Sequence, residues 1–251
     1  MSLTLPLRDH VALVTGGAGG IGAAVSGALA AAGARVVITY NTDAAKASAL
    51  LATLPGAGHA VFQAAVQDSA RLAELAAFVQ ATYGRLDVLV NNAGVTTPVA
   101  HADLDRLSDE WIDRIFTTNW RGAFATTRAC LPLLQASGNG LVVNMSSVAG
   151  QTGIGSNVAY CASKAALDSL TRSLGRALAP AVRVVSVSPG WVLGDYTAHI
   201  DPDYLARQVA ATPLGRLATP ADVADAVLAL ATTLRFTTGA IIPVDGGRPL
   251  G

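Results

Sequence analysis

Short apolar segments alternate with helical segments along almost the whole chain, and this alternation limits the possible folds more than any other feature. Strands are expected at 10–15, 35–39, 60–64, 86–91, 141–145, 182–187 and 240–244. Helices are expected up to residue 32, at 44–54, 70–83, 158–178 and 220–232, and in a region that ends near residue 134. Strands without polar alternation are buried on both faces, which is typical of a parallel sheet sandwiched between helices. The sequence therefore predicts a doubly wound α/β fold.

The 251 residues contain no Pro/Ser-rich linker and no shift in composition, so residues 1–251 are expected to form a single domain. The formal net charge is zero, which favours neither nucleic acid nor an anionic membrane surface as a partner. The start of the chain does not resemble a signal peptide, and no segment of about 18 residues is continuously apolar. We therefore expect a cytoplasmic protein. The two cysteines give no disulfide framework, and the four histidines show no metal-ligand spacing, so no metal site is expected.

A glycine-rich segment, Gly16-Gly17-Ala18-Gly19-Gly20-Ile21-Gly22, separates the first expected strand from the first expected helix. Glycines at this point allow the backbone to approach a pyrophosphate closely. The start of the helix supplies free N–H groups and a partial positive charge. This arrangement predicts a dinucleotide site at the end of the first strand.

Tyr160 and Lys164 lie four residues apart in an expected helix, so their side chains project from the same face. A phenol titrates near pH ~10, and a neighbouring ammonium group lowers that pKa by stabilising the phenolate anion. Tyr160 is therefore a candidate general acid and base. Taken alone, the same spacing also fits a solvated helix face.

Several further motifs occur in order, and together they resemble the classical short-chain dehydrogenase/reductase family from about residue 8 to the C-terminus. They are Thr15-Gly16-x-x-x-Gly20-x-Gly22, Asn91-Asn92-Ala93-Gly94, Asn119, Ser147 thirteen residues before Tyr160, Pro189-Gly190 and Val244-Asp245-Gly246-Gly247. The resemblance implies a Rossmann-type domain and a homotetramer. It also implies an oxidoreductase that transfers a hydride between a nicotinamide cofactor and a ketone or secondary alcohol.

The resemblance also implies roles for individual residues. Tyr160 is expected to exchange a proton with the substrate oxygen, Ser147 to hydrogen-bond that oxygen, and Lys164 to stabilise the tyrosinate and hold the nicotinamide ribose. Asn119 is expected to fix a water molecule beside Lys164, although an asparagine that merely kinks the helix is the alternative. The expected cofactor-binding residues are Gly16, Gly20, Ile21, Gly22, Tyr40, Asn41, Thr42, Val66, Asn92, Tyr160, Lys164, Pro189, Gly190 and Val192. Substrate contacts are expected from Ser147, Gln151, Tyr160 and Trp191.

The sequence departs from the family pattern at three places. Ala65-Val66 stand where many members have an aspartate for the adenine amine, so the adenine is left with backbone groups or Gln67. Gly194 replaces a threonine that often contacts the nicotinamide. The second strand ends Thr39-Tyr40-Asn41-Thr42 without an acidic residue. Because a carboxylate there would repel the 2′-phosphate, its absence favours NADP(H), with NAD(H) as the alternative.

Residues 191–212 are expected to form a lid over the active site. Its large side chains, Trp191, Tyr196, His199, Ile200 and Tyr204, favour a neutral, moderately hydrophobic substrate, although they also fit a subunit contact. The segment 135–140 lacks basic residues, which disfavours an acyl group on an acidic carrier protein. Open alternatives are an NAD(H)-dependent alcohol dehydrogenase, a 3-oxoacyl thioester reductase and a non-catalytic, cofactor-binding regulatory protein.

Overall fold

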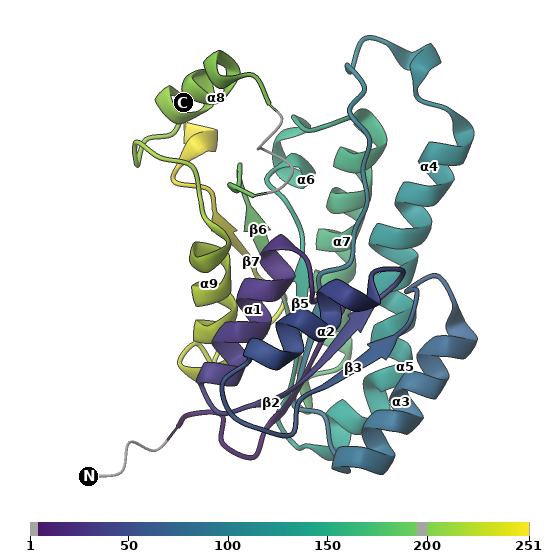
Figure 1. Cartoon of the computed structure of the whole chain (residues 1–251). Coiled ribbons are helices and arrows are strands. Elements are labelled where there is room, and N and C mark those ends of the chain that lie inside the picture. The colour runs from purple at the N-terminus through teal and green to yellow at the C-terminus, as the bar shows by residue number, and fades with distance from the viewer. Residues whose placement is uncertain (1–4, 195–199, 251) are drawn as a thin grey trace.

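The computed structural model describes residues 5–194 and 200–250. In these residues seven parallel strands form one sheet in the order β3-β2-β1-β4-β5-β6-β7. Helices cover both faces of the sheet (Figure 1), so the predicted doubly wound, Rossmann-type fold is confirmed. The strands are β1 (Val11–Val14), β2 (Arg35–Tyr40), β3 (Ala60–Gln63), β4 (Val88–Asn91), β5 (Gly140–Met145), β6 (Val182–Pro189) and β7 (Ile241–Val244).

The expected strands and helices agree with the observed ones to within two residues at each end. The α-helices are α1 (Gly20–Ala31), α2 (Ala44–Thr53), α3 (Ser69–Tyr83), α4 (Asp109–Phe116), α5 (Ala123–Ala136), α6 (Ala149–Thr152), α7 (Val158–Ala177), α8 (Pro202–Ala210) and α9 (Pro220–Thr232). The remaining helical turns are η1 (Leu104–Arg106), the π-helical η2 (Thr117–Gly122) and η4 (Arg248–Leu250). In the described part of the chain, no helix is both long enough and apolar enough to cross a membrane.

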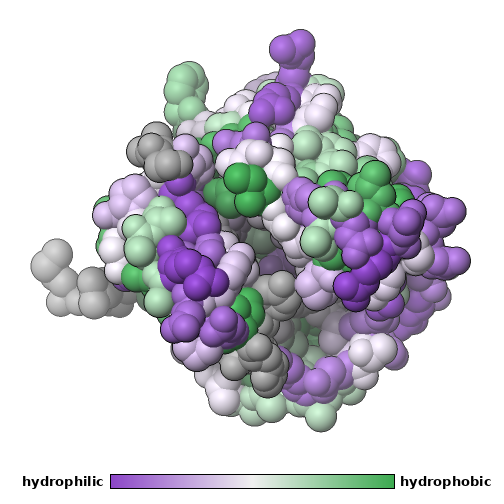
Figure 2. Space-filling model, turned by 90° about the horizontal axis from the view of Figure 1, so that it is seen from above, coloured by the Kyte–Doolittle hydropathy of each residue, from purple (hydrophilic) through white to green (hydrophobic). Residues whose placement is uncertain are grey.

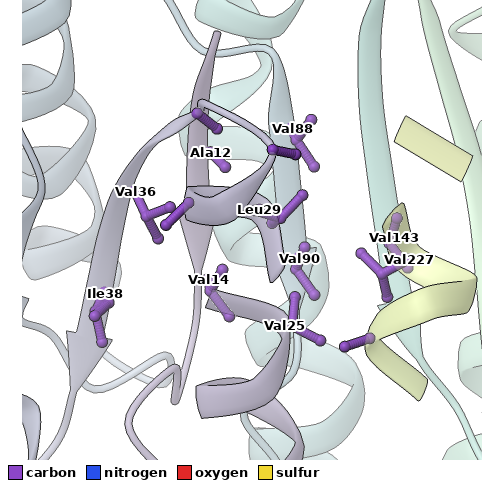
Figure 3. Close-up of a cluster of buried hydrophobic side chains, with 14 of the residues drawn as sticks. Ala12, Val14, Val25, Leu29, Val36, Ile38, Val88, Val90, Val143 and Val227 are labelled. Carbon is purple, nitrogen blue, oxygen red and sulfur yellow. The ribbon is translucent and has the colours of Figure 1, made fainter. Parts of the chain in front are cut away.

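Buried aliphatic side chains join the helices to the sheet. Figure 3 shows Val25 and Leu29 of α1 beside residues of β1, β2 and β4, and both side chains are fully buried. Helix α9 packs along α1 on the same face, whereas α3, α5 and α7 cover the other. Burying one such aliphatic side chain contributes about 1.5–3 kcal/mol to the stability of the fold. The packed helices therefore hold the ends of the strands in fixed positions.

The strand order reverses beside β1, because β2 and β3 extend to one side of it and β4 to the other. Ligands of doubly wound folds bind at such a reversal, outside the carboxyl ends of the strands. The glycine-rich segment follows β1 directly, and Asn92 follows β4. Both therefore lie at the position that the topology marks for a ligand.

Among the described residues, α6 and α8 are helices that were not expected from the sequence. Helix α8 lies within the predicted lid and begins where the Asp201 carboxylate accepts a hydrogen bond from the Asp203 N–H group, with Pro202 in the first turn. The expected lid residues Tyr196 and His199 lie outside the described residues. Trp191 and Tyr204 meet edge to face, with ring centroids 5.7 Å apart.

Candidate active site

A cavity of about 1390 Å³ opens at the carboxyl ends of the strands. Figure 2, which looks down on this end, shows the surface hollowed near its middle. The cavity brings together residues from segments that are far apart in the chain. Of the residues expected from the sequence, its lining includes Ile21, Asn92, Ser147, Tyr160, Lys164, Pro189, Gly190, Trp191 and Val192.

Other expected residues lie elsewhere. Gln151 is exposed on α6 and does not line the cavity, unlike its neighbour Thr152, so the substrate contact expected from Gln151 finds no support in this geometry. Asn119 is buried behind the cavity wall. The remaining expected cofactor residues are outside the lining and adjoin the glycine loop, the end of β2 or the end of β3; they are Gly16, Gly20, Gly22, Tyr40, Asn41, Thr42 and Val66.

The glycine loop has the geometry of a phosphate cradle. A Cβ atom at Gly22 would lie 2.5 Å from the Gly16 carbonyl oxygen and 2.7 Å from the Asn92 amide nitrogen, so only glycine fits there. Gly16 itself has a φ of +60°, in the region that favours glycine. No side chain caps the start of α1, so its first N–H groups face the crevice with the positive end of the helix dipole. The loop therefore fits a dinucleotide pyrophosphate.

Hydrogen bonds tie this loop to the end of β4. The Asn92 side-chain amide donates to the carbonyl oxygens of Thr15 and Gly16, at 2.9 and 3.1 Å. The Thr15 hydroxyl in turn accepts hydrogen bonds from the backbone N–H groups of Asn92 and Ala93, at 3.0 and 3.1 Å. The two neighbouring strand ends thus form one connected framework.

Lys164 is a buried cation in the cavity wall, and its pKa is shifted from the ordinary value. Its side chain is almost fully buried, and Nζ donates a hydrogen bond to the Met145 carbonyl oxygen at 2.7 Å. Nζ also lies 5.6 Å from the centroid of the Tyr160 ring. Burial lowers the pKa of Lys164 to about 8, while the negative charge of Asp168 acts in the opposite direction. The charge on this ammonium group is therefore sensitive to pH near neutrality.

Tyr160 is positioned by the cap of its own helix. The Asn157 carboxamide oxygen accepts a hydrogen bond from the Tyr160 N–H group at 2.7 Å, and its amide nitrogen donates to the Thr97 carbonyl oxygen at 2.7 Å. Ser147 follows β5, and its hydroxyl accepts a hydrogen bond from the Ala149 N–H group at 3.2 Å. Both Tyr160 and Ser147 are half-buried and line the cavity. A substrate oxygen can therefore reach both hydroxyl groups.

Asn119 lies in the π-helical turn between α4 and α5. Its side-chain oxygen accepts a hydrogen bond from the Val95 N–H group at 2.8 Å, and its nitrogen donates to the Ser163 hydroxyl at 3.1 Å. A Cβ atom at Gly94 would lie 3.3 Å from the Asn119 side-chain oxygen and 3.7 Å from Lys164 Nζ. Asn119 therefore lies close to Lys164, across a glycine. A single π turn of this kind often occurs at a functional site.

The ends of β2 and β3 lie on the side of the glycine loop away from β4. The Gly17 N–H group donates to the Thr39 carbonyl oxygen at 3.2 Å, which places Tyr40 directly beside the loop. Tyr40 is half-buried, whereas Asn41 and Thr42 are exposed. Gln67 donates its amide to Thr118 at 2.8 Å, so this amide is already engaged within the protein.

Sequence reasoning missed the basic side of the cavity. Arg207 of α8 and Arg248 of η4 both line it, together with the buried Gln208 and the exposed Asp201. The Asp201-Pro202 pair is a signal for the start of a helix that carries Arg207, but it does not predict that this helix faces the cavity. The segment 135–140 leads into the amino end of β5, at the opposite end of the strands from the cavity, so its lack of basic residues does not bear on the charge at the cavity mouth.

The sheet order, the glycine loop and the polar cavity at the strand ends are the features of a dinucleotide-binding α/β oxidoreductase. Residues 16–248 match a protein family described as enoyl-(acyl carrier protein) reductase. The chain belongs to the classical short-chain dehydrogenase/reductase family, whose members use NAD(H) or NADP(H), and it is an oxidoreductase of that family.

Individual relatives match over almost their full length. The chain is 42% identical over 246 residues to a protein of Streptomyces violaceoruber named as ketoacyl reductase 2 of the granaticin polyketide synthase, with 96% of each chain covered. It is 33% identical over 248 residues to 2,5-dichloro-2,5-cyclohexadiene-1,4-diol dehydrogenase LinX of Sphingobium indicum, with 98% of each covered. Among solved structures, it resembles a short-chain dehydrogenase/reductase (glucose/ribitol dehydrogenase) of Brucella melitensis at 29% identity, with a TM-score of 0.90 and 98% and 99% coverage of the two chains.

Proposed function

We propose that this protein transfers a hydride between NADP(H) and a ketone or secondary alcohol, with Tyr160 as the general acid and base. The observation that carries the proposal is the buried Lys164 ammonium group beside the Tyr160 ring, in the wall of the same cavity as Ser147. A cation in this place stabilises a phenolate and allows a tyrosine to exchange protons near neutral pH. A binding protein without chemistry has no physical need for a buried cation at such a point.

Each residue has a separate part in the reaction. In reduction, the Tyr160 hydroxyl donates its proton to the carbonyl oxygen, and in oxidation the tyrosinate takes that proton back from the alcohol. Ser147 donates a hydrogen bond to the same oxygen and fixes its position. Lys164 stabilises the tyrosinate, and Asn119 holds the backbone at Val95 next to it. The nicotinamide supplies the chemistry of hydride transfer to and from the carbon atom.

The cofactor-binding residues follow the edge of the sheet. The glycine loop and the first turn of α1 would hold the pyrophosphate, while Tyr40, Asn41 and Thr42 would surround the adenosine ribose and its phosphate. Val66 is buried against Gly122, so its backbone is the part that would face the adenine. Asn92, Pro189, Gly190 and Val192 would contact the nicotinamide half. We further propose that the chain acts as one domain in the cytoplasm and that residues 191–212 close over the bound substrate.

Oxidation of NADPH by a panel of ketones tests this function directly. Purified protein should consume NADPH, followed by its absorbance, when an aliphatic or alicyclic ketone is added, and the product should be the corresponding alcohol. The apolar wall of the cavity, which includes Pro98, Val99, Ile154 and Trp191, favours ketones with a hydrocarbon body. Cofactor binding without turnover of any ketone or alcohol would instead support the regulatory alternative.

A thioester substrate is the second candidate, because the relative with 42% identity is named as a ketoacyl reductase. The arginines that line the cavity agree with such a substrate, since thioesters of coenzyme A and of carrier proteins bear phosphate groups. Turnover of acetoacetyl-CoA with an efficiency well above that of simple ketones would favour this candidate.

The cofactor preference is expected to depend on Tyr40. The wild-type protein should have a higher kcat/KM with NADPH than with NADH, because the end of β2 bears no carboxylate to repel the 2′-phosphate. The next carboxylate along the chain, that of Asp43, accepts a hydrogen bond from the Lys46 N–H group at 2.8 Å and caps α2. Tyr40→Asp should lower the NADPH/NADH ratio of kcat/KM by about tenfold or more through like-charge repulsion. A wild-type ratio below one would contradict this view of the strand end.

We expect a homotetramer with two-fold axes, as the family resemblance implies. Strand β7 is an edge strand whose residues are only partly covered, and the nearby Phe236 is fully exposed. Trp120 and Phe124 also stack, half-buried, near the start of α5. Exposed apolar groups of this kind are typical of subunit contacts. Light scattering at micromolar concentration should give four times the chain mass, and a monomer mass would refute the assembly.

A further inference from the structure

The cavity has a basic end that the proposed chemistry does not use. Arg207 and Arg248 both line it, although they lie 41 residues apart in the chain. Neither has a part in the proton transfer assigned to Tyr160 and Lys164. Helix α8 and the C-terminal turn η4 lie close together at the end of the molecule that carries the cavity (Figure 1), where Arg248 contacts Gln208.

The Arg248 guanidinium group is held in place by α8. Its two terminal nitrogens donate hydrogen bonds to the backbone carbonyl oxygen of Gln208, at 3.1 Å, and to the side-chain oxygen of the same residue. Gln208 is only 8% exposed, so this anchor is itself fixed in the protein. A guanidinium group has five N–H donors, and these two contacts leave others to face a ligand.

Arg207 is oriented by aromatic stacking. Its guanidinium carbon lies 5.6 Å from the centroid of the Tyr204 ring, and Tyr204 in turn meets Trp191 edge to face. This stacking keeps the cation beside the apolar wall of the cavity. Stacking does not use the N–H donors in the guanidinium plane, so they remain able to bind an anion.

The charges at the rim do not cancel one another. In the described residues, neither Arg207 nor Arg248 forms an ion pair. Asp201 lines the same cavity, but its carboxylate accepts a hydrogen bond from the Asp203 N–H group and caps α8. His101, across the cavity, contacts the Gly155 carbonyl oxygen. Because two arginines and one hydrogen-bonded carboxylate line this part of the cavity, its rim is positively charged and attracts anions.

We propose that Arg207 and Arg248 bind an anionic group, a carboxylate or a phosphate, at the end of the substrate remote from its carbonyl. This inference rests on the proposed function and revises the class of substrate. Instead of the neutral substrate expected from the lid residues, we propose a substrate with a hydrocarbon body and an anionic end. The apolar wall contacts the body, Ser147 and Tyr160 contact the carbonyl oxygen, and the two guanidinium groups contact the anion. Bidentate hydrogen bonding suits guanidinium to both kinds of oxyanion.

The test compares each anionic ketone with its neutral partner. A series of aliphatic oxo acids, with increasing separation between ketone and carboxylate, is assayed beside the methyl esters. Acetoacetyl-CoA is assayed beside S-acetoacetyl-N-acetylcysteamine, which lacks the phosphates. Wild-type protein should show a kcat/KM about tenfold or more higher for the anionic member of one of these pairs, as expected of charged hydrogen bonds. Preference within the first pair identifies a carboxylate, and preference within the second identifies a phosphate.

Arg207→Gln and Arg248→Gln should each bring the anionic-to-neutral ratio of kcat/KM toward one, mainly through a higher KM for the anionic member. Arg176→Gln is the matched control: it removes the same charge from the exposed last turn of α7, far from Tyr160, and should leave the ratio unchanged. Thermal unfolding verifies that each variant is folded, and Arg207 is exposed on α8, so at least its replacement leaves the core intact.

The outcomes separate this inference from the function on which it rests. Equal kcat/KM for the members of both pairs in wild-type protein would overturn the anion site while leaving a ketone reductase. An anionic preference that survives in both arginine variants would overturn it as well. Failure of every ketone and thioester, with cofactor bound, would overturn the proposed function itself.

Discussion

Tyr160→Phe is expected to lower kcat for ketone reduction by about 100-fold or more, while the dissociation constant of the cofactor changes by less than about threefold. The substitution removes one oxygen atom and keeps the ring against which Lys164 packs. It therefore removes the proton donor with little change in the shape of the cavity. Steady-state kinetics and fluorescence titration with NADPH measure the two effects separately.

Tyr83→Phe is the matched control for that experiment. Its hydroxyl donates a hydrogen bond to the Gly58 carbonyl oxygen at 2.9 Å, at the far end of α3, so the same atom is removed away from the cavity. This variant should keep wild-type kcat. If Tyr160→Phe retained activity within threefold of wild type, the assignment of Tyr160 as general acid and base would be wrong.

Lys164→Met is expected to abolish turnover and also to weaken cofactor binding, because one ammonium group serves both the tyrosine and the ribose. The loss should amount to at least about 100-fold in kcat/KM, similar to other losses of acid–base catalysis. In the wild-type protein, kcat/KM for reduction should fall as the pH rises above about 8, where Lys164 loses its proton. That pH dependence should be absent from any residual activity of the variant.

The same variant should not unfold at a lower temperature than the wild type at pH 7. Because the folded state lowers the pKa of Lys164, the folded protein binds fewer protons than the unfolded chain between about pH 8 and pH 10. The free energy of unfolding therefore increases with pH in that window, and below it the buried charge is a net cost of a few kcal/mol. Methionine removes this cost, although the Met145 carbonyl oxygen loses its donor. A Tm several degrees lower would show that Lys164 is primarily a structural residue.

The sequence was sufficient to predict the sheet and the meeting of Ser147, Tyr160 and Lys164 in one cavity wall, because both depend on local patterns. Uninterrupted valine and leucine runs such as Val11–Val14 fit burial on both faces, and their observed burial agrees with this. The helical spacing of Tyr160 and Lys164 fixes their common face. Ser147 follows β5, and the carboxyl end of β5 lies beside the start of α7. Ser147 therefore lines the same cavity as Tyr160 and Lys164.

The basic rim could not be predicted in this way, because it depends on a contact between distant segments. Arg248 meets α8 through the backbone of Gln208, and no local period in the sequence encodes that meeting. Gln151 lies on the four-residue helix α6 next to Thr152, which lines the cavity, so a difference of one residue decides which side chain faces it. Local sequence patterns predict on which helix or strand a side chain lies. The packing of helices and strands against one another decides which side chains face a cavity.

The hydrogen bonds between Asn92, Thr15 and Gly16 have a consequence for how fast and how tightly a dinucleotide is captured. They hold the glycine loop against the end of β4 in its cradle conformation. Ordering a flexible backbone costs roughly 1–2 kcal/mol per residue in conformational entropy, and a loop already fixed in the folded chain avoids that cost on binding. Association should therefore require no slow rearrangement of the loop.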